Sequence, residues 1–590
     1  MWVLPFLYFD HPIPIASFYA EWSAAALGVC AMLLLATPRF WQPLRIPRIA
    51  LLPAALAMLV MVQFALGRGA YVEQSLLFSL YLLWAALLII LGRHLREELS
   101  LPTLATVLAL FLLVGAELSA LIGVLQHYSV QTFGVLVMDT DIAAVTGNLA
   151  QSNHFADYVT LGLVSLGLLF FRWKLKAWQL VLLAAPLLFV LVLSGSRSPW
   201  LYLSCIAGMS FFWQRRDKSS LPLLQYSLLV LLGFGLMHLV VQTPWLTGTH
   251  GNVTAAQRLV EAGVVAGATG GAGGSIRLSI WREAWLIFTQ NPLMGAGFGQ
   301  YPWQHFQLGP VLRDVNMSNL NDYVEHAHNL VLHLAAETGL TGLLILFGTM
   351  SLWLTQAYRA PRTVYHWWGY AVLAVLAIHS MLEYPLWYTF FLGVAAIVLG
   401  MLDDTSYRWP FRGNIGTVGR WSVLAVLLSG LLILSQMLQD YRKLVNLQAV
   451  MSQTATADDG YFRQLRDDLV GTQGQAALLR PYIESLLGEA GWNHITDKRA
   501  LNERVMRYAP TSEVAYREML LLARDGRQAE ARMQIERVIW TYPKDFPGML
   551  IQLERLARMD KDPARFPALL DFALQKYEEW QRATHLSQAD

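Results

Sequence analysis

The stretch Leu101–Leu125, LPTLATVLALFLLVGAELSALIGVL, decides the fold of this chain. Its only charged side chain is Glu117, and it has the length of about 17–25 apolar residues with which an α-helix crosses a bilayer. The runs Leu221–Val241 and Trp421–Leu438 have the same character. Because a helix pairs its backbone polar groups within the segment, it can lie in lipid. These stretches therefore predict membrane-spanning helices.

The composition of the whole chain agrees with this prediction. Of its 590 residues, 55% are hydrophobic and 14% are charged, whereas soluble domains carry about 25% charged residues. Many of the 21 tryptophans stand at the ends of apolar runs, where membrane interfaces favour aromatic rings. The formal net charge of +2 gives no indication of nucleic-acid binding. Cys30 and Cys205 lie inside apolar runs, which argues against a disulfide framework.

The number of apolar runs predicts an all-α polytopic membrane protein with about twelve transmembrane helices. The runs begin near Ala16, Ile49, Ser75, Leu101, His154, Gln179, Ser198, Leu221, Asn329, Tyr365, Pro385 and Trp421. The segment Trp2–Phe9 is too short to cross a membrane alone. No basic residue precedes it, so we expect an interfacial segment or the remnant of a first helix, and no cleavable signal peptide.

The loops between these runs alternate in charge. The basic loops carry Arg39, Arg45 and Arg48; Arg93 and Arg96; Arg172, Lys174 and Lys176; Arg215, Arg216 and Lys218; Arg359 and Arg362; and Arg408, Arg412 and Arg420. Residues 126–153 hold no lysine or arginine, and they include Asp139 and Asp141. Since basic loops stay in the cytoplasm, the other loops are expected on the opposite side of the membrane.

The chain divides into four predicted segments. Residues 1–243 and 326–439 hold the transmembrane helices, and residues 244–325 form a long non-cytoplasmic loop with the glycine-rich stretch Gly267–Gly274. Residues 440–590 are polar and predict a soluble α-helical domain on the same side. There, Thr511 marks a helix start and Gly526 a break, which predicts one helix–turn–helix unit of about tetratricopeptide length.

Polar groups at the ends of the spans are candidates for function. All strong candidates fall on the non-cytoplasmic side, as a single site requires, and we expect them to meet in one pocket. They are Gln151, Asn153 and His154; Arg197; Arg277 and Arg282; Glu325, His326, His328 and Asn329; and Glu383 and Tyr384.

The candidate arginines predict phosphate binding, because a guanidinium group is always charged and its planar fork matches phosphate oxygens. Arg197 lies in a short loop near the bilayer surface, at the depth of a lipid pyrophosphate headgroup. Alternatively, Arg197 extends into the interface or pairs with Glu383. Arg277 and Arg282 belong to an amphipathic segment, which could equally be a plain interfacial helix.

The candidate histidines predict proton transfer, since an imidazole can take a proton from a hydroxyl group during nucleophilic attack. His326 and His328 could instead be hydrogen-bonded interfacial residues. The His-x-His spacing lacks a third ligand at a diagnostic distance, so we expect no metal. Asn329 could orient an imidazole or cap the following helix. Glu337 lies in an apolar run and needs a partner.

These same residues carry a resemblance to a known family. His326–Leu332, HAHNLVL, followed by Glu337–Leu340, ETGL, resembles the signature of the O-antigen ligase/polymerase superfamily. Within it, His379–Tyr388, HSMLEYPLWY, is similar to the PglL-type bacterial protein O-oligosaccharyltransferases, and Gly147–His154 and Ser196-Arg197 fit the same group. The resemblance covers most of the membrane region. The first span is shorter than in the family, and Ala150 stands where many relatives carry glycine.

The resemblance implies a GT-C-like membrane fold in the bacterial inner membrane, with its active site facing the periplasm. It implies en bloc transfer of an oligosaccharide from undecaprenyl pyrophosphate to serine or threonine of an exported protein, typically a type IV pilin. His328 is the implied general base, and Arg197 and Arg277 hold the pyrophosphate. We further expect Arg282 to assist, and we expect no cofactor. Gln151 and Tyr384 are expected to bind sugar or phosphate, with His154, Asn329 and Glu383 in support.

Other functions remain open from the sequence. An O-antigen ligase would use a lipid A-core sugar as acceptor, and a polymerase would use another glycan. A transporter of lipid-linked glycans would also need many spans, but transporters often contain inverted repeats and polar residues near the midplane. The sequence shows no such repeat, and its polar candidates lie at one surface. A membrane-anchored scaffold would not need twelve spans.

Overall fold

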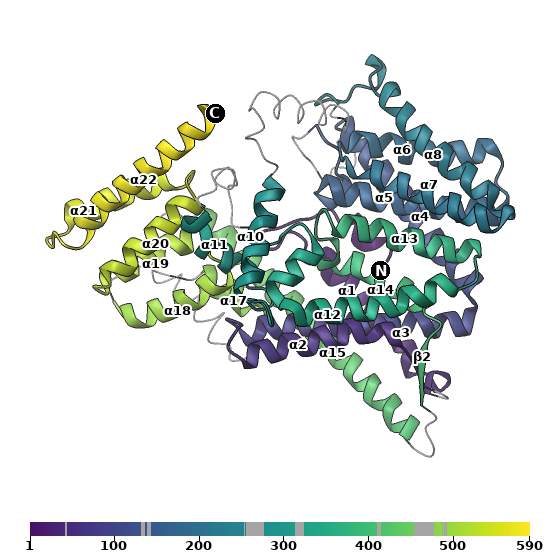
Figure 1. The fold of residues 1–590 in the computed structure, drawn as a ribbon, viewed down its shortest axis with the longest axis horizontal. Coiled ribbons are helices and arrows are strands. Elements are labelled where there is room, and N and C mark those ends of the chain that lie inside the picture. Colours follow the sequence, from purple (N-terminus) through teal and green to yellow (C-terminus); the bar gives the residue numbers. More distant parts are fainter. Residues whose placement is uncertain are drawn as a thin grey trace. The chain divides into compact units, whose positions relative to one another are not determined.

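The computed structural model of the chain is 79% helical (Figure 1). It describes residues 1–41, 44–130, 136–138, 143–252, 254, 276–312, 324–409, 415–453, 477–486, 488 and 493–589. Gly267–Gly274, Asp139, Asp141 and Arg412 lie outside the described residues. The chain forms two compact units. The first comprises Met1–Ala54, Tyr81–Gly263 and Phe347–Leu438, and the second comprises Ala55–Leu80, Val264–Leu346 and Gln439–Asp590. The four segments expected from the sequence remain a prediction.

Each of the twelve predicted apolar runs is an α-helix. Within the first unit lie α1 (Phe18–Met32), α4 (Leu101–His127), α5 (Ser152–Trp173), α6 (Ala177–Leu193), α7 (Ser198–Arg216), α8 (Leu221–Val240), α13 (Val364–Ser380) and α14 (Thr389–Leu402). Four helices have residues in both units: α2 (Leu51–Ala65), α3 (Val72–Leu99), α12 (Leu330–Arg359) and α15 (Ile415–Gln453). Among the described residues, eight helical segments are long and apolar enough to cross a membrane. The predicted all-α polytopic fold is thus confirmed.

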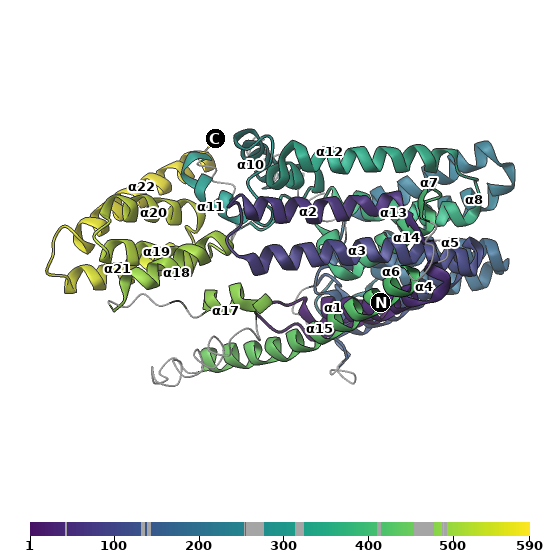
Figure 2. The same cartoon turned by 90° about the horizontal axis from the view of Figure 1, so that it is seen from below.

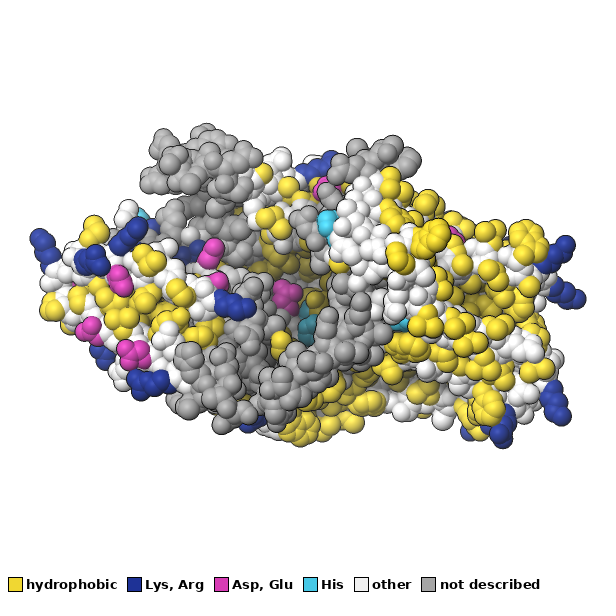
Figure 3. All heavy atoms as spheres, turned by 90° about the horizontal axis from the view of Figure 1, so that it is seen from above, with side chains coloured by type: hydrophobic (Ala, Val, Ile, Leu, Met, Phe, Trp, Pro, Cys, Tyr) yellow, Lys and Arg dark blue, Asp and Glu magenta, His cyan; other side chains and the backbone are white. Residues whose placement is uncertain are grey.

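Helix α5 is the centre of the first unit. Every residue from His154 to Leu169 is buried, and α5 contacts α4, α6, α7, α8 and α13. In contrast, α8 exposes Leu228, Leu229 and Leu232, and Figure 3 shows apolar side chains spread over the surface of this part of the molecule. Leucines that face outward suit a lipid environment. The first unit therefore has buried inner helices, among them α5 and α14, and outer helices such as α8 whose apolar side chains face outward.

Helix α15 is the most exposed of the candidate spans. Only 6% of its apolar window is buried, against 89% for α5. It lies beside α1 (Figure 2), where Trp22 donates a hydrogen bond of 2.7 Å to the carbonyl oxygen of Leu434. Lipid is expected to cover the rest of its surface.

The N-terminal segment packs into the core of the first unit. It forms a single 3₁₀ turn, Leu4–Leu7, and Phe6 is fully buried. The ring of Phe6 stacks on Tyr158 of α5, with 3.8 Å between the ring centroids. The Tyr158 hydroxyl group donates a hydrogen bond of 2.8 Å to the carbonyl oxygen of Trp2. The segment is therefore part of the helix packing, and it is too short to cross a membrane.

Several basic loops meet at one end of the first unit. The loop after α1 forms the strand β1 (Leu44–Pro47), which pairs antiparallel with β2 (Ser406–Trp409) of the loop after α14. Arg96, near the end of α3, lies 2.7 Å from the carboxylate of Asp404. Three loops that the charge alternation assigns to the same side of the membrane are therefore in contact.

Two more basic loops join this end. Arg216, at the end of α7, donates a hydrogen bond of 2.8 Å to the hydroxyl group of Tyr358 on α12. Arg362, between α12 and α13, lies over the same tyrosine ring at 5.5 Å. Gln356 of α12 donates to the carbonyl oxygen of Leu402 at the end of α14, at 3.2 Å. The basic loops after α1, α3, α7, α12 and α14 therefore gather as the alternation predicts.

The second unit contains two helices from the long loop and a C-terminal group. The loop forms α10 (Ile276–Gln290) and α11 (Tyr301–Leu312). The C-terminal helices are α17 (Arg480–Leu486), α18 (Ile495–Tyr508), α19 (Ser512–Arg524), α20 (Gln528–Thr541), α21 (Phe546–Met559) and α22 (Phe566–Ala589). The Thr511 hydroxyl caps α19, and Gly526, with a φ of +78°, begins the turn into α20. The predicted helix–turn–helix unit is therefore present.

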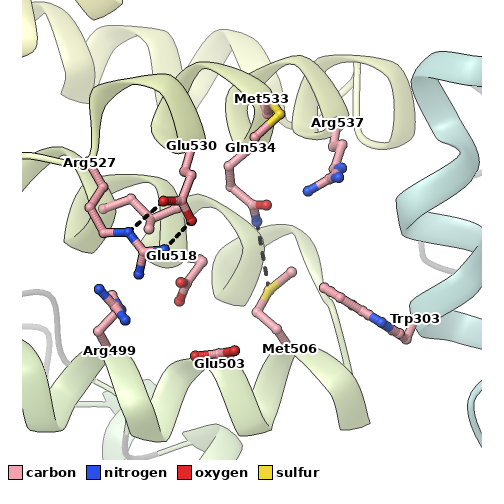
Figure 4. A pocket seen from close by; sticks show the side chains of 11 residues that line it. Trp303, Arg499, Glu503, Met506, Glu518, Arg527, Glu530, Met533, Gln534 and Arg537 are labelled. Carbon is pink, nitrogen blue, oxygen red and sulfur yellow. Dashed lines mark hydrogen bonds and ion pairs between the residues drawn. The ribbon is translucent and has the colours of Figure 1, made fainter.

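Helix α11 shares the core of the C-terminal helices. Phe306 is fully buried there, 6.2 Å from the ring of Tyr542. Trp303 lines a pocket of about 160 Å³ together with Met506 of α18 and Arg537 of α20 (Figure 4). Helix α11 and the C-terminal helices are therefore packed as one body.

The packing of α5 predicts opposite effects for two glycine-to-alanine substitutions. A Cβ atom on Gly162 of α5 would collide with the Cβ atom of Ala116 on α4, whereas Gly208 of α7 has nothing within 4 Å. We expect Gly162→Ala to lower the free energy of unfolding by about 1–3 kcal/mol. Gly208→Ala should raise it by up to about 1 kcal/mol, because alanine favours helix. Thermal unfolding in detergent measures both, and equal effects would contradict this packing.

Candidate active site

Asn153 joins three candidate motifs in the first unit. From the start of α5, its Nδ2 donates a hydrogen bond of 3.0 Å to Oε1 of Glu383, which lies between α13 and α14. Its Oδ1 accepts a hydrogen bond of 2.7 Å from the hydroxyl group of Ser196, in the loop between α6 and α7. Arg197 follows Ser196 directly. The helix ends that carry these residues are opposite to the ends with the basic loops, as the alternation predicts.

Arg197 points away from the protein core. Its neighbours Ser194, Ser196 and Ser198 are buried, while Arg197 itself is exposed. The part of the chain that the structure describes contains no ion pair of Arg197, and Glu383 accepts from Asn153 instead. The alternative in which Arg197 pairs with Glu383 is therefore not observed. Its guanidinium group can take an anionic partner from outside the protein.

Gln151 and His154 shape the start of α5. Oε1 of Gln151 accepts a hydrogen bond of 2.8 Å from the backbone N–H of His154, which caps the helix. The buried His154 ring packs against Tyr388 and Tyr384, with centroid distances of 4.7 and 6.3 Å. Gln151 thus has a structural role as a cap, and its contact with substrate stays a prediction. Tyr384 is held beside the imidazole of His154.

The residue before this cap has an unusual backbone conformation. Ala150 has a φ of +58°, in the left-handed region that favours glycine. This conformation fits the expectation from the resemblance that many relatives carry glycine at this position. Alanine tolerates this region at a cost of roughly 1–2 kcal/mol, so the turn that starts α5 keeps its shape.

A buried hydrogen-bonded pair that the sequence analysis missed lies beneath this group. Nδ1 of His379 lies 2.8 Å from Oδ2 of Asp157, and both side chains are fully buried. His379 is near the end of α13, and its carbonyl oxygen accepts a hydrogen bond of 2.8 Å from the backbone N–H of Glu383. An aspartate inside an apolar run, one turn after Asn153, was the available signal. The pair fixes α5 against α13 and so positions Asn153 next to Glu383.

The histidine motif in the second unit forms a turn that is held by hydrogen bonds at the start of α12. Oδ1 of Asn329 accepts hydrogen bonds of 3.1 Å from the backbone N–H groups of Val331 and Leu332. Asn329 therefore caps α12, and its orientation of an imidazole stays a prediction. His328 has a φ of +50° and is partly exposed. Such a conformation is strained for a residue with a side chain, and strain of this kind clusters at functional sites.

The pKa of His326 is held well below its ordinary value. Burial is the main cause, because it disfavours the charged form, and the neighbouring His333 and His328 add to it. The ring of His326 lies 5.2 Å from that of His333, edge to face. His326 is therefore neutral near pH 7.

A buried carboxylate stands behind this turn. Oε1 of Glu337 accepts a hydrogen bond of 3.0 Å from the backbone N–H of Tyr301, on α11. Its Oε2 lies 3.3 Å from Nε2 of His333. Nδ1 of His333 in turn accepts a hydrogen bond of 3.3 Å from the backbone N–H of Ala327. The sequence analysis expected a partner for Glu337 but did not identify His333.

Two glycines bring the loop before α11 against α12. Gly295 and Gly339 have φ values of +67° and +64°, and a Cβ atom on Gly295 would collide with the backbone of Glu337. Gln63 donates hydrogen bonds to the carbonyl oxygens of Met294 at 2.6 Å and Glu337 at 2.8 Å. These contacts fix α12 at the break in its backbone at Gly339.

The two candidate arginines of α10 differ in exposure. Arg282 is exposed on the face opposite the buried Ile280 and Ala284, and Arg277 is half-buried beside that buried face. Glu283 of α10 forms a buried contact of 2.9 Å with Nδ1 of His305 on α11.

Helix α10, helix α11 and the histidine turn pack on one small core. It contains Ile280, Ala284, Ile287, Tyr301, Leu308, Val324, Ala327 and Ala336. The structure therefore brings the helix of Arg277 and Arg282 together with the turn of His326 and His328 in the second unit. The group around Asn153 belongs to the first unit, and the expectation that both groups form one pocket stays a prediction. Over the described ranges, no cluster of three or more His, Cys, Asp or Glu side chains could hold a metal ion.

Comparison with known proteins finds similarity to a family of ligases and a family of polymerases in both units. Residues 181–347 match the family described as O-antigen ligase, and residues 367–550 match the family described as virulence factor membrane-bound polymerase, C-terminal. The chain is 25% identical to the general O-oligosaccharyltransferase of Acinetobacter baylyi, over 78% of this chain and 77% of that protein. It is 22% identical to the ComP-specific O-oligosaccharyltransferase of the same organism, over 59% of this chain and 60% of that protein.

The two family matches include the histidine turn, both helices of the long loop and the motif from His379 to Tyr388. Together, the two family matches and the similarity to the general O-oligosaccharyltransferase support a PglL-type bacterial protein O-oligosaccharyltransferase of the O-antigen ligase/polymerase superfamily.

Proposed function

We propose that this protein transfers an oligosaccharide en bloc from undecaprenyl pyrophosphate to a serine or threonine of an exported protein. The reaction takes place at the periplasmic face of the bacterial inner membrane, and the acceptor is a type IV pilin. The observation that carries the proposal is the turn at His328, where the backbone has a positive φ. The cap of α12 by Asn329 and the buried contact of Glu337 with His333 lie on either side of this turn. The names of the relatives support the class of reaction.

In the proposed reaction, His328 accepts the proton of the acceptor hydroxyl group. The oxygen forms a bond to the anomeric carbon while the bond from that carbon to the pyrophosphate oxygen breaks. Undecaprenyl pyrophosphate leaves with the electron pair, and the imidazolium later loses its proton to water. A single displacement inverts the anomeric configuration. General base catalysis of this kind contributes about 10²–10⁴-fold to the rate.

The arginines stabilise the charge that develops on the leaving group. Arg197, Arg277 and Arg282 are assigned to the pyrophosphate, because their guanidinium groups can each donate two parallel hydrogen bonds to its oxygens. Arg197 is exposed and carries no ion pair within the described chain, which leaves it able to bind an anion. This positive charge serves the reaction without a metal ion.

The remaining candidates have supporting roles. Gln151 and Tyr384 are assigned to hydrogen bonds with sugar or phosphate. His154 packs against Tyr384, and Asn153 holds Glu383, so both keep the α13–α14 connection in place. Asn329 fixes the start of α12 and thereby the backbone that follows His328.

A second function is favoured by the family matches, which are described as O-antigen ligase and membrane-bound polymerase. Those reactions use the same donor with a glycan acceptor. Deletion of the gene separates the alternatives. The proposal expects glycopeptides to disappear from exported proteins, including pilin, while the O-antigen ladder on lipopolysaccharide is unchanged. Glycans that persist on every protein, together with a lost ladder, would identify a ligase or polymerase.

Substitution of the proposed base provides the first direct test. His328→Asn keeps a residue that tolerates positive φ but removes the imidazole. We expect protein glycosylation to fall about 10²–10⁴-fold, measured by mass spectrometry of glycopeptides from complemented deletion cells. His494 is a matched control, because it has a φ of +52° and is exposed in the C-terminal domain. His494→Asn should leave glycosylation unchanged, and normal glycosylation by His328→Asn at equal protein level would exclude the role.

The role of Arg197 predicts a change in donor binding. Arg197→Ala should raise the KM for the lipid-linked donor at least about tenfold, since it removes a charge-assisted hydrogen bond worth about 1.5–3 kcal/mol. Arg197→Lys should recover part of this loss, because it restores the charge without the fork. The exposed Arg172 at the end of α5 is the control. If Arg172→Ala and Arg197→Ala raise the KM equally, Arg197 has no specific role.

The proposed orientation is tested by cysteine labelling. Cys30 and Cys205 are first replaced by alanine, and a single cysteine is introduced as Arg197→Cys or as Arg172→Cys. A membrane-impermeant maleimide, added to cells with a permeable outer membrane, should label the first variant only. Labelling of the second variant should appear after the inner membrane is broken. The reverse pattern would place the candidate residues in the cytoplasm.

A further inference from the structure

The backbone between the two candidate histidines is held by a third histidine. Nδ1 of His333 accepts a hydrogen bond of 3.3 Å from the N–H of Ala327, the residue between His326 and His328. His333 is 3% exposed, and its backbone N–H donates to the carbonyl oxygen of Asn329 at 2.9 Å. His333, in the first turn of α12, therefore contacts the histidine turn through both its side chain and its backbone N–H group.

These contacts determine where the imidazole of His333 carries its proton. Since Nδ1 accepts a hydrogen bond, the neutral ring carries its proton on Nε2. Nε2 lies 3.3 Å from Oε2 of Glu337, and the Glu337 side chain is 2% exposed. A carboxylate at this position favours the tautomer with a proton on Nε2, as carboxylates hydrogen-bonded to the far nitrogen of other functional histidines do.

Glu337 is itself fixed from two sides. Its Oε1 accepts from the backbone N–H of Tyr301, and its carbonyl oxygen accepts from Gln63 at 2.8 Å and from the N–H of Gly297 at 3.0 Å. The carboxylate therefore cannot turn away from His333 without loss of the Tyr301 contact. Two hydrogen bonds and, between them, the 3.3 Å contact of Glu337 with His333 therefore connect α11 to Ala327.

The conformation of the turn needs such support. His328 has a φ of +50°, and a residue stays in that region only where its surroundings determine it strongly. The peptide N–H of Ala327 is held on one side of His328, and the Asn329 cap is held on the other. Release of either would let the His328 backbone relax to negative φ and redirect its imidazole.

We propose that His333 is a positioning residue. Glu337 sets the tautomer of His333, and Nδ1 of His333 holds the peptide of Ala327, so that His328 faces the acceptor hydroxyl group. This inference rests on the proposed function and adds to it the group that sets the direction of the base. His333 does not itself touch the substrate. Its contribution is to kcat, because misplacement of a base by about 1 Å can cost about 100-fold in rate.

Two substitutions of His333 separate positioning from simple packing. The side-chain oxygen of asparagine falls near the place of Nδ1 and can accept from Ala327, but its amide does not reach Glu337. The amide nitrogen of glutamine falls near the place of Nε2 and can donate to Glu337, but nothing accepts from Ala327. Glutamine is the better helix former. If His333 has only a structural role, the His333→Gln variant should have the higher kcat. If the proposal is right, the His333→Asn variant should have the higher kcat.

The experiment measures kcat and the KM for donor and acceptor with purified protein in detergent. The donor is extracted from a deletion strain, and the acceptor is a host protein that loses its glycan in that strain. We expect His333→Asn to keep kcat within about threefold of wild type, and His333→Gln to lower it about 10- to 100-fold with little change in KM. Glu337→Gln should also lower kcat, because its amide no longer favours the Nε2 tautomer.

A buried histidine elsewhere serves as the control. His238 of α8 is 6% exposed and contacts the carbonyl oxygen of Phe234 in its own helix. His238→Asn and His238→Gln should alter the thermal unfolding midpoint without a difference in kcat. The proposal is overturned if His333→Gln equals or exceeds His333→Asn in kcat. If wild-type protein transfers no glycan, the proposed function has failed instead, and the two failures are thus distinguishable.

Discussion

The fully buried contact between Asp157 and His379 is the constraint on which the first unit depends. A carboxylate inside a helix bundle is tolerated only when it is paired, and loss of one partner of such a pair costs about 3–5 kcal/mol. The contact joins α5, which is buried from His154 to Leu169, to α13. With these helices fixed, Asn153 meets Glu383, and the connection between α13 and α14 is placed beside the loop of Arg197.

The second unit uses the same chemistry at two further places. Glu283 contacts His305 between α10 and α11, and Glu337 contacts His333 within α12. Each of these buried pairs lies directly behind residues with a proposed role in the reaction. The buried pairs provide rigidity behind these residues, which is how preorganised sites keep their geometry.

Much of the fold follows from the sequence, because length and apolarity alone define a membrane span. The charge alternation also predicts which loops meet, since Arg96 and Arg216 belong to loops that gather at one end of the first unit. The site is less accessible to sequence reasoning. The roles of Gln151 and Asn329 as helix caps depend on local backbone geometry that residue type alone leaves open.

Contacts between distant residues could not be predicted. Asp157 and His379 are 222 positions apart, and neither apolar run indicates which other helix it contacts. His333 lies close to the histidine motif, yet its role depends on a turn that only the structure shows. The positive φ of His328 is likewise invisible in the residue letters.

The central claim is that this chain by itself catalyses glycan transfer, with His328 as the base. Reconstitution in detergent micelles with purified lipid-linked donor and acceptor polypeptide tests it most directly, because micelles offer no second compartment for transport. The account predicts a glycosylated serine or threonine, release of one undecaprenyl pyrophosphate per glycan, and inversion at the anomeric carbon. Retention of the anomeric configuration would contradict the single displacement, and a donor that is moved across vesicles but never transferred would contradict the claim as a whole.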